Sequence, residues 1–283
     1  MNTFKTGLLL IGLTLILLVG GRAIAGKQGM TIALGMAVLM NGAAYFFSDK
    51  IALRMSGAEP VARENAPRLY AIVEGLCGKA NLALPKLYMI PQAAPNAFAT
   101  GRSPKHASVA VTVGLLELMT DEELEGVIAH ELSHVGNYDI LTASVAATLA
   151  GAITWIAQMG RWALIFGGGS RDDERDGGGL AALLMLIVAP IAALLIQLAI
   201  SRQREYAADA SGTRLVGHPF GLIKALEKLG EYNKRIPMDV SPATSSLFIV
   251  APLGAGQTFM SWFSTHPPLE KRITALRDLV VTR

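Results

Sequence analysis

The chain has 283 residues, a net charge of +3 and one cysteine; 52% of the residues are hydrophobic and 17% are charged. A mean hydropathy of +0.42 is too high for an ordinary soluble domain, yet the fraction of charged residues is too high for a bundle wholly in lipid. We therefore expect a membrane part and a water-exposed part. No long basic run predicts a nucleic-acid surface, and the single Cys77 excludes an intrachain disulfide and is expected to be a small buried apolar residue.

Four apolar segments predict transmembrane helices, because a helix needs roughly 20 apolar residues to cross a bilayer. The first reaches that length only if it is counted from residue 4 to 25, with Lys5 and Arg22 extending toward the interface. It also resembles a signal peptide, with Ala23-Ile24-Ala25 as a cleavage region. The other three are residues 30–47, 140–166 and 180–201.

The apolar segments divide the chain into alternating membrane and soluble parts. Residues 1–47 hold two N-terminal spans joined by a short turn at 20–29, and residues 140–201 form a hairpin of two spans around the polar, glycine-rich loop 167–179. Residues 48–139 and 202–283 have soluble character, and we expect them to form one domain. Lysine and arginine are more frequent in the parts of these two blocks that adjoin the spans than in the short connections between spans. This bias predicts that both blocks are cytoplasmic.

The first soluble block is predicted to contain a helix, a small sheet and a second helix. Residues 64–79 have an amphipathic helical pattern, and residues 86–90, 96–100 and 107–113 resemble short strands. Thr120 is a predicted N-cap, with Glu123 three residues later completing a capping box. The stretch from 121 is therefore expected to be a helix of about four turns.

That helix carries a pattern typical of a metal site. His130 and His134 are four residues apart and so lie on one helical face, where two imidazoles can bind one zinc ion. Glu131 lies between them and can take a proton from a water without ligating the metal. The pattern His-Glu-x-x-His on a helix indicates a zinc metalloprotease.

A catalytic zinc usually has three protein ligands and one open position. The best candidate for the third ligand is Glu205. Asp209 follows it at i+4 and can accept a hydrogen bond from the far nitrogen of a zinc-bound histidine. Asp139 and Asn137 are weaker candidates for the same orienting role, and a helix C-terminal cap and turn explains them equally well.

"HELSHVGNYD" followed by "EYAAD", with two apolar segments before these motifs and two between them, resembles the HtpX-type membrane zinc metalloproteases. "NAFATG" and "STHPPLEKRI" also look like that family's pattern, and the resemblance covers nearly the whole chain. It implies a zinc-dependent endopeptidase of the bacterial inner membrane, with one zinc ion per chain and a role in membrane-protein quality control under stress. Its expected partners are protein substrates, mainly membrane proteins, and the lipid bilayer, with no nucleic acid.

The expected fold class is mainly α with a small β-sheet: four transmembrane helices plus a cytoplasmic α+β zincin-like metalloprotease domain. Residues 48–139 would form the first part of the catalytic domain, with the His-Glu-x-x-His helix, and residues 202–283 the second part, with the third zinc ligand.

Three further functional segments are expected. His266, and less firmly Arg272, are candidates for stabilising the tetrahedral oxyanion, although residues 265–268 could simply begin the last helix. Substrate backbone would add to a strand, either at residues 108–113 or along 96–100. Residues 233–258, low in charge and with three prolines, are a candidate cover for the site. The residues of the second strand candidate are Asn96, Ala97, Phe98, Ala99 and Thr100.

Two alternative functions remain open at this point. A CAAX-type prenyl protease shares the metal motifs but has more spans, and nothing in the sequence marks a prenyl-binding cavity. A membrane adaptor with a structural zinc is the alternative outside the enzymes. Glu131 argues against the adaptor, because a structural zinc needs no base and is usually closed by a fourth ligand.

Overall fold

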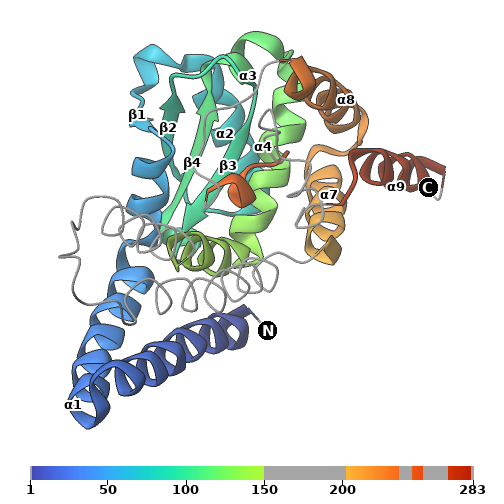
Figure 1. The fold of residues 1–283 in the computed structure, drawn as a ribbon. Helices are drawn as coiled ribbons and strands as arrows, with labels where there is room; N and C mark the ends of the chain where they lie inside the picture. The colour runs from blue at the N-terminus through green and yellow to red at the C-terminus, as the bar shows by residue number, and fades with distance from the viewer. Residues whose placement is uncertain (1, 150–201, 236–243, 251–266, 282–283) are drawn as a thin grey trace.

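The computed structural model describes residues 2–149, 202–235, 244–250 and 267–281. This part of the chain is mostly helical and contains a small mixed sheet (Figure 1). In chain order the elements are α1 (Asn2–Met55), β1 (Glu59–Pro60), η1 (Arg63–Asn65), α2 (Pro67–Ala80), β2 (Lys86–Ile90), β3 (Ala97–Gly101), η2 (Pro104–His106), β4 (Ala107–Thr112), α3 (Val113–Leu118), α4 (Asp121–Gly136), an unlabelled helix (Asp139–Leu149), α7 (Arg202–Val216), α8 (Phe220–Arg235), η3 (Ser245–Leu247) and α9 (Leu269–Val281).

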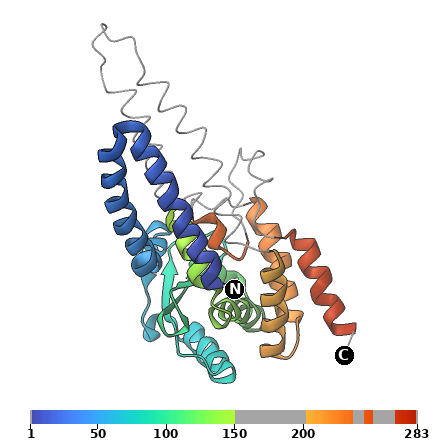
Figure 2. The same ribbon diagram turned by 90° about the horizontal axis from the view of Figure 1, so that it is seen from below.

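Helix α1 is a hairpin whose two arms lie against each other (Figure 2). The chain reverses at Gly26, whose φ of +58° is a conformation that glycine adopts without steric cost. Farther along the arms, the Asn41 side-chain amide donates hydrogen bonds to the Leu10 carbonyl (3.2 Å) and to Thr14 Oγ1 (2.9 Å). The predicted turn at 20–29 is therefore a reversal between two helical arms.

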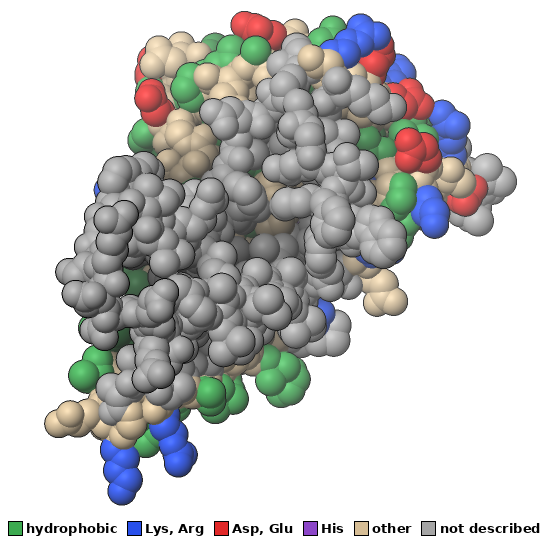
Figure 3. Space-filling view, in the orientation of Figure 1, with side chains coloured by type: hydrophobic (Ala, Val, Ile, Leu, Met, Phe, Trp, Pro, Cys, Tyr) green, Lys and Arg blue, Asp and Glu red, His purple; other side chains and the backbone are tan. Residues whose placement is uncertain are grey.

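Many large apolar side chains of α1 are exposed, among them Phe4, Val38 and Leu39. Some hydrophobic side chains are visible at the lower edge of the molecule in Figure 3. Among the described residues, one helix is long and apolar enough to cross a membrane, Gly26–Met55, with a mean hydropathy of 1.6. Phe4–Val19 and Asp139–Leu149 are shorter apolar helices. Four spans thus stay a prediction: the third is described only to residue 149, and the fourth, at 180–201, and the loop 167–179 lie outside the described residues.

The sheet has four strands in the order β1-β2-β4-β3. Strand β2 pairs in parallel with β4, whereas β1 pairs antiparallel with β2 and β3 pairs antiparallel with β4. Strand β3 is therefore an edge strand, paired along one side only. Its five residues are nevertheless all buried, so other parts of the chain cover its second side.

Alternate residues of the strands face two hydrophobic clusters, as the two-residue period of a strand requires. One face, with Val109 and Val111, packs on α2, α4 and α8. The other face, with Phe98 and Ala110, packs on the end of α1, on the helix Asp139–Leu149 and on Phe248. A third cluster joins both arms of α1 to the helix Asp139–Leu149. The helix that carries the histidine pair thus lies against one face of the sheet, and the membrane-type helices lie against the other.

The local predictions for this block are largely confirmed. The three strands occur within one residue of their predicted bounds, and Val113 begins α3 instead of ending β4. The predicted helix at 64–79 starts late, because residues 63–65 form a short 3-10 turn and Pro67 occupies the first turn of α2. Cys77 is buried, and burial raises the pKa of its thiol to about 11.

Candidate metal-binding active site

Helix α4 is fixed at its start and closely packed along its length. Thr120 and Glu123 form the predicted capping box: Thr120 N–H donates to Glu123 Oε2 at 2.8 Å, and Glu123 N–H donates to Thr120 Oγ1 at 3.4 Å. Gly126 lets α8 approach closely, because a Cβ there would lie 2.5 Å from Leu222 N. These contacts hold the next two turns of α4, which carry the histidine pair.

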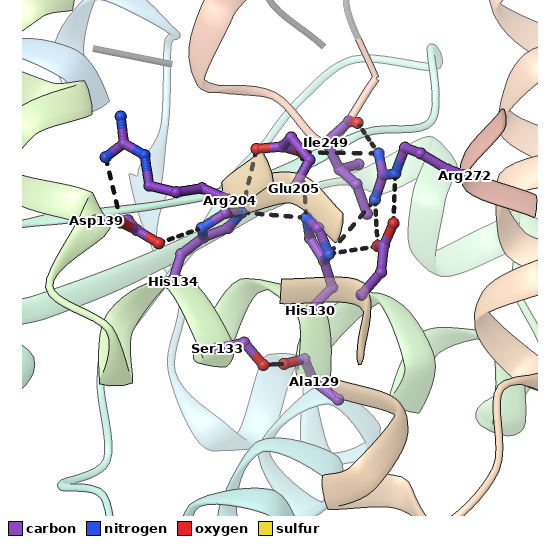
Figure 4. Close-up of polar contacts among 10 residues, drawn as sticks. Ala129, His130, Ser133, His134, Asp139, Arg204, Glu205, Ile249 and Arg272 are labelled. Atoms are coloured by element: carbon purple, nitrogen blue, oxygen red, sulfur yellow. Dashed lines mark hydrogen bonds and ion pairs between the residues drawn. The ribbon is translucent and has the colours of Figure 1, made fainter. Parts of the chain in front are cut away.

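His130 and His134 point toward the same place from successive turns of α4, and their Nε2 atoms are 3.3 Å apart (Figure 4). Glu205 reaches this place from α7, with Oε2 3.7 Å from His130 Nε2 and Oε1 3.5 Å from His134 Nε2. Neighbouring ligand atoms of a tetrahedral zinc with bonds of about 2.0–2.1 Å lie about 3.3 Å apart. The three donor groups are therefore spaced as such a metal ion requires.

The two far nitrogens of the imidazoles are bound by carboxylates. Asp209 Oδ1 lies 2.8 Å from His130 Nδ1, and Asp139 Oδ2 lies 3.1 Å from His134 Nδ1. Arg204 donates in turn to Asp139 Oδ1 at 3.2 Å. A carboxylate on Nδ1 fixes the ring orientation and leaves Nε2 free to ligate, so both aspartates have the geometry expected of orienting residues.

Arg272 of α9 has no exposed surface and lies on the Nδ1 side of His130. It donates to Asp209 twice, from Nε at 2.8 Å and from Nη2 at 2.6 Å. Its Nη1 donates to the Ile249 carbonyl at 3.0 Å. This placement favours a role in holding Asp209 and a peptide carbonyl over the expected contact with an oxyanion. His266, the other oxyanion candidate, lies outside the described residues.

The cluster has more buried carboxylates than buried cations. Burial alone would raise the pKa of Asp209, but the adjacent Arg272 outweighs it and lowers this pKa to about 2. Burial would lower the pKa of His134, but Asp139, Glu205 and Glu131 raise it to about 9. Such an environment favours a bound cation.

Glu131 is 2% exposed and belongs to the same cluster. Burial raises its pKa, with a further contribution from Glu205, while the two histidines and a hydrogen bond from the Ala99 backbone act in the opposite direction. A carboxylate whose pKa is raised toward neutrality is suited to general-base catalysis.

Two side-chain contacts in this region could not be predicted from the sequence. Arg204 bonds Asp139 across 65 residues, and the Asn96 side chain bonds the Val250 backbone across 154 residues. The sequence pattern predicts Asn96 only as part of a strand. Its own amide is buried and faces the 248–250 segment, which a strand pattern does not reveal.

Comparison with known proteins identifies the family. The profile described as Peptidase family M48 matches residues 63–280. The chain is 56% identical over 279 residues to a protein named Protease HtpX homolog from Thermodesulfovibrio yellowstonii, covering 99% of each chain. It is 52% identical over 277 residues to the protein of the same name from Desulforapulum autotrophicum, covering 98% of this chain and 89% of that one.

A solved structure has the same fold. The crystal structure of S. mikatae Ste24p matches with a TM-score of 0.51 and 21% identity, over 93% of this chain and 61% of that chain. The chain thus spans about three fifths of the length of that protein. The matched family and the near full-length relatives agree with the resemblance expected from the motifs. The chain belongs to peptidase family M48 and is a metalloprotease.

Proposed function

We propose that this chain is a zinc-dependent endopeptidase of the bacterial inner membrane that cuts membrane proteins at the cytoplasmic face. The observation that supports it most is the convergence of His130, His134 and Glu205, whose ligand atoms all lie within 4.8 Å of one another. Two imidazoles and one carboxylate are a set typical of catalytic zinc, which leaves one position open.

In this proposal His130, His134 and Glu205 would hold one zinc ion per chain, and Asp209 and Asp139 orient the two imidazoles. A zinc ion in such a site polarises the scissile carbonyl and lowers the pKa of a water from about 15.7 toward 7. Glu131 takes the proton of the attacking water and later delivers it to the leaving amine. His266 is proposed as a further donor to the oxyanion.

The proposed location near the membrane rests on how the site is connected to the apolar helices. Asp139, which bonds His134, is the first residue of the apolar helix Asp139–Leu149. That helix packs on both arms of α1. Glu205 is in the first turn of α7, four residues after the predicted fourth span ends. His134 is six residues before the predicted third span begins at residue 140, so the metal would lie close to both spans.

The test of the chemistry uses the full chain in detergent with casein and a fluorogenic peptide. Cleavage that a chelator abolishes and zinc restores is expected, and the Glu131→Gln protein should bind a full equivalent of zinc without cleaving. If Glu131→Gln cleaves at the wild-type rate, Glu131 is not the base. If a fully chelated protein still cleaves, the metal has no part in the reaction.

The proposed substrate class has its own test. Matched cleavage sites are placed at increasing distances from a span of a membrane substrate reconstituted with the enzyme. Cleavage is expected to fall with distance, because the site would be held near the bilayer. Equal cleavage at all distances would contradict the preference for membrane substrates while leaving the peptidase chemistry intact.

A further inference from the structure

The side of β3 that faces away from β4, which we call the β3 edge, has backbone groups that β4 does not bind. The Asn96 carbonyl accepts a hydrogen bond from Thr112 N–H at the end of β4. Because backbone groups alternate along a strand, Ala97, Ala99 and Gly101 direct their N–H and C=O groups toward the β3 edge. An extended peptide could add to the sheet there.

Three parts of the same chain already bind these groups. The Ala97 carbonyl accepts from Ile249 N–H at 2.9 Å. The Ala99 backbone bonds the Glu131 carboxylate, and Gly101 N–H donates to Ser144 Oγ at 3.4 Å. The β3 edge is therefore occupied at each of these residues, which explains why an edge strand is buried throughout.

The segment 248–250 is held by its backbone, much as an extended peptide would be held. Asn96 bonds both backbone groups of Val250: Nδ2 donates to the carbonyl at 2.8 Å, and Oδ1 accepts from the N–H at 3.4 Å. Arg272 Nη1 donates to the Ile249 carbonyl at 3.0 Å. Phe248 is extended, with φ −73° and ψ 146°, and packs edge-to-face on Phe98.

These contacts lie next to the proposed metal ligands. The Arg272 Nη1 that binds the Ile249 carbonyl is 3.9 Å from Glu205 Oε2 (Figure 4). The four backbone groups of Ile249 and Val250 are all bonded by Ala97, Asn96 and Arg272. Contacts with a peptide backbone do not depend on the side chains of that peptide, so another extended segment could make the same set.

We propose that residues 248–250 act as an internal pseudo-substrate, which occupies the peptide-binding site formed by Asn96, Ala97 and Arg272. A protein substrate must displace this segment before it pairs with β3. The inference rests on the proposed peptidase function and adds to it an intramolecular competitor for the substrate backbone.

The first experiment compares the kinetics of full-length variants on a fluorogenic peptide. Ile249→Pro removes the N–H that bonds Ala97, and the ψ of Phe248 suits a residue that precedes proline. Ile249→Val keeps the N–H and is the matched control. Loss of one backbone hydrogen bond from the competitor is expected to lower KM about fivefold with kcat unchanged, whereas Ile249→Val should behave as wild type. An unchanged or higher KM in a folded Ile249→Pro protein would overturn the proposal.

The second experiment does not depend on cleavage or on the folding of that variant. Zinc-loaded Glu131→Gln protein is mixed with a labelled hexapeptide that copies residues 245–250, and binding is followed by fluorescence anisotropy. Deuterium exchange of the protein's own 245–250 amides is expected to rise when the hexapeptide binds. Binding without that rise, or no binding at millimolar peptide, would overturn the proposal. A wild-type protein that cleaves nothing would contradict the peptidase function instead, and the exchange result would still decide whether the segment is displaced.

Discussion

Arg272 donates two hydrogen bonds to Asp209 across 63 residues of chain, at 2.8 and 2.6 Å, and both residues are buried. The pair joins α9 to α7 directly behind His130. A buried arginine and a buried aspartate each lose hydration, so each depends on the other for compensation. The orientation of His130 is thereby tied to the C-terminal helix.

Asp209→Asn is expected to weaken zinc binding about 10–100-fold, because the amide is a poorer acceptor for His130 Nδ1–H and leaves Arg272 without its charged partner. Zinc affinity is measured by competition with a chromophoric chelator. Asp278→Asn, at an exposed position of α9, is the control and should bind zinc as wild type. Wild-type affinity in Asp209→Asn would show that Asp209 does not orient the ligand.

Glu205→Ala is expected to lose bound zinc, because two imidazoles alone give only two of the three protein ligands of a catalytic site. Metal content of the purified protein is measured by atomic absorption. Glu227→Ala is the control, since that carboxylate pairs with the exposed Arg277 on the surface. A full equivalent of zinc in Glu205→Ala would mean that another residue ligates.

Glu123→Gln is expected to destabilise the protein near neutral pH by about 1 kcal/mol, because it loses a charged hydrogen bond with Lys228 at 2.7 Å. Burial alone would raise the pKa of Glu123, but Lys228 and the Thr120 backbone hold it below its usual value. A lowered pKa stabilises the folded state above the unfolded value of about 4.3, and this contribution is lost as the pH falls through the lower folded value.

The difference in melting temperature between Glu123→Gln and wild type should therefore be constant from pH 7 to about 5 and shrink below about 4. Thermal unfolding followed by circular dichroism across that range measures it. A difference that stays constant down to pH 3 would show that the charge of Glu123 is not what stabilises the cap.

Gly126→Ala is expected to destabilise the folded protein by about 1–3 kcal/mol, because the new Cβ would lie 2.5 Å from Leu222 N. That atom belongs to the backbone of α8, so the clash is relieved only if the helix shifts. Gly75→Ala on α2 is the matched control. Nothing lies within 4 Å of a Cβ at Gly75, so alanine should be neutral or stabilise by up to about 1 kcal/mol. Denaturant unfolding of both variants gives the comparison, and equal stabilities would show that α4 and α8 can separate at no cost.

The local structure around α4 was predictable because its signals are local. The capping box requires residues three apart, and the two histidines share a face because they are four apart. The same spacing argument put Asp209 beside Glu205 on one face of α7, where the structure has it bonded to His130.

The remaining contacts were not predictable because they join distant segments. A strand pattern identified residues 96–100, but it cannot show which edge of the strand is open or what covers it. The bonds of Ile249 to Ala97 and of Asn96 to Val250 depend on how η3 returns to the sheet. The contacts of Arg272 with Asp209 and Ile249 were not predictable for the same reason, since the position of Arg272 relative to His130 is set by the packing of α9.

The helix Asp139–Leu149 begins at the residue that bonds His134, and one turn later Thr142 bonds Thr6 of α1 at 2.9 Å in the protein interior. The packing of α1 and the orientation of one imidazole of the proposed zinc site thus depend on the same short helix. Because α1 is proposed to lie in the bilayer, we predict that cleavage rates differ between detergent and liposomes of different acyl-chain length.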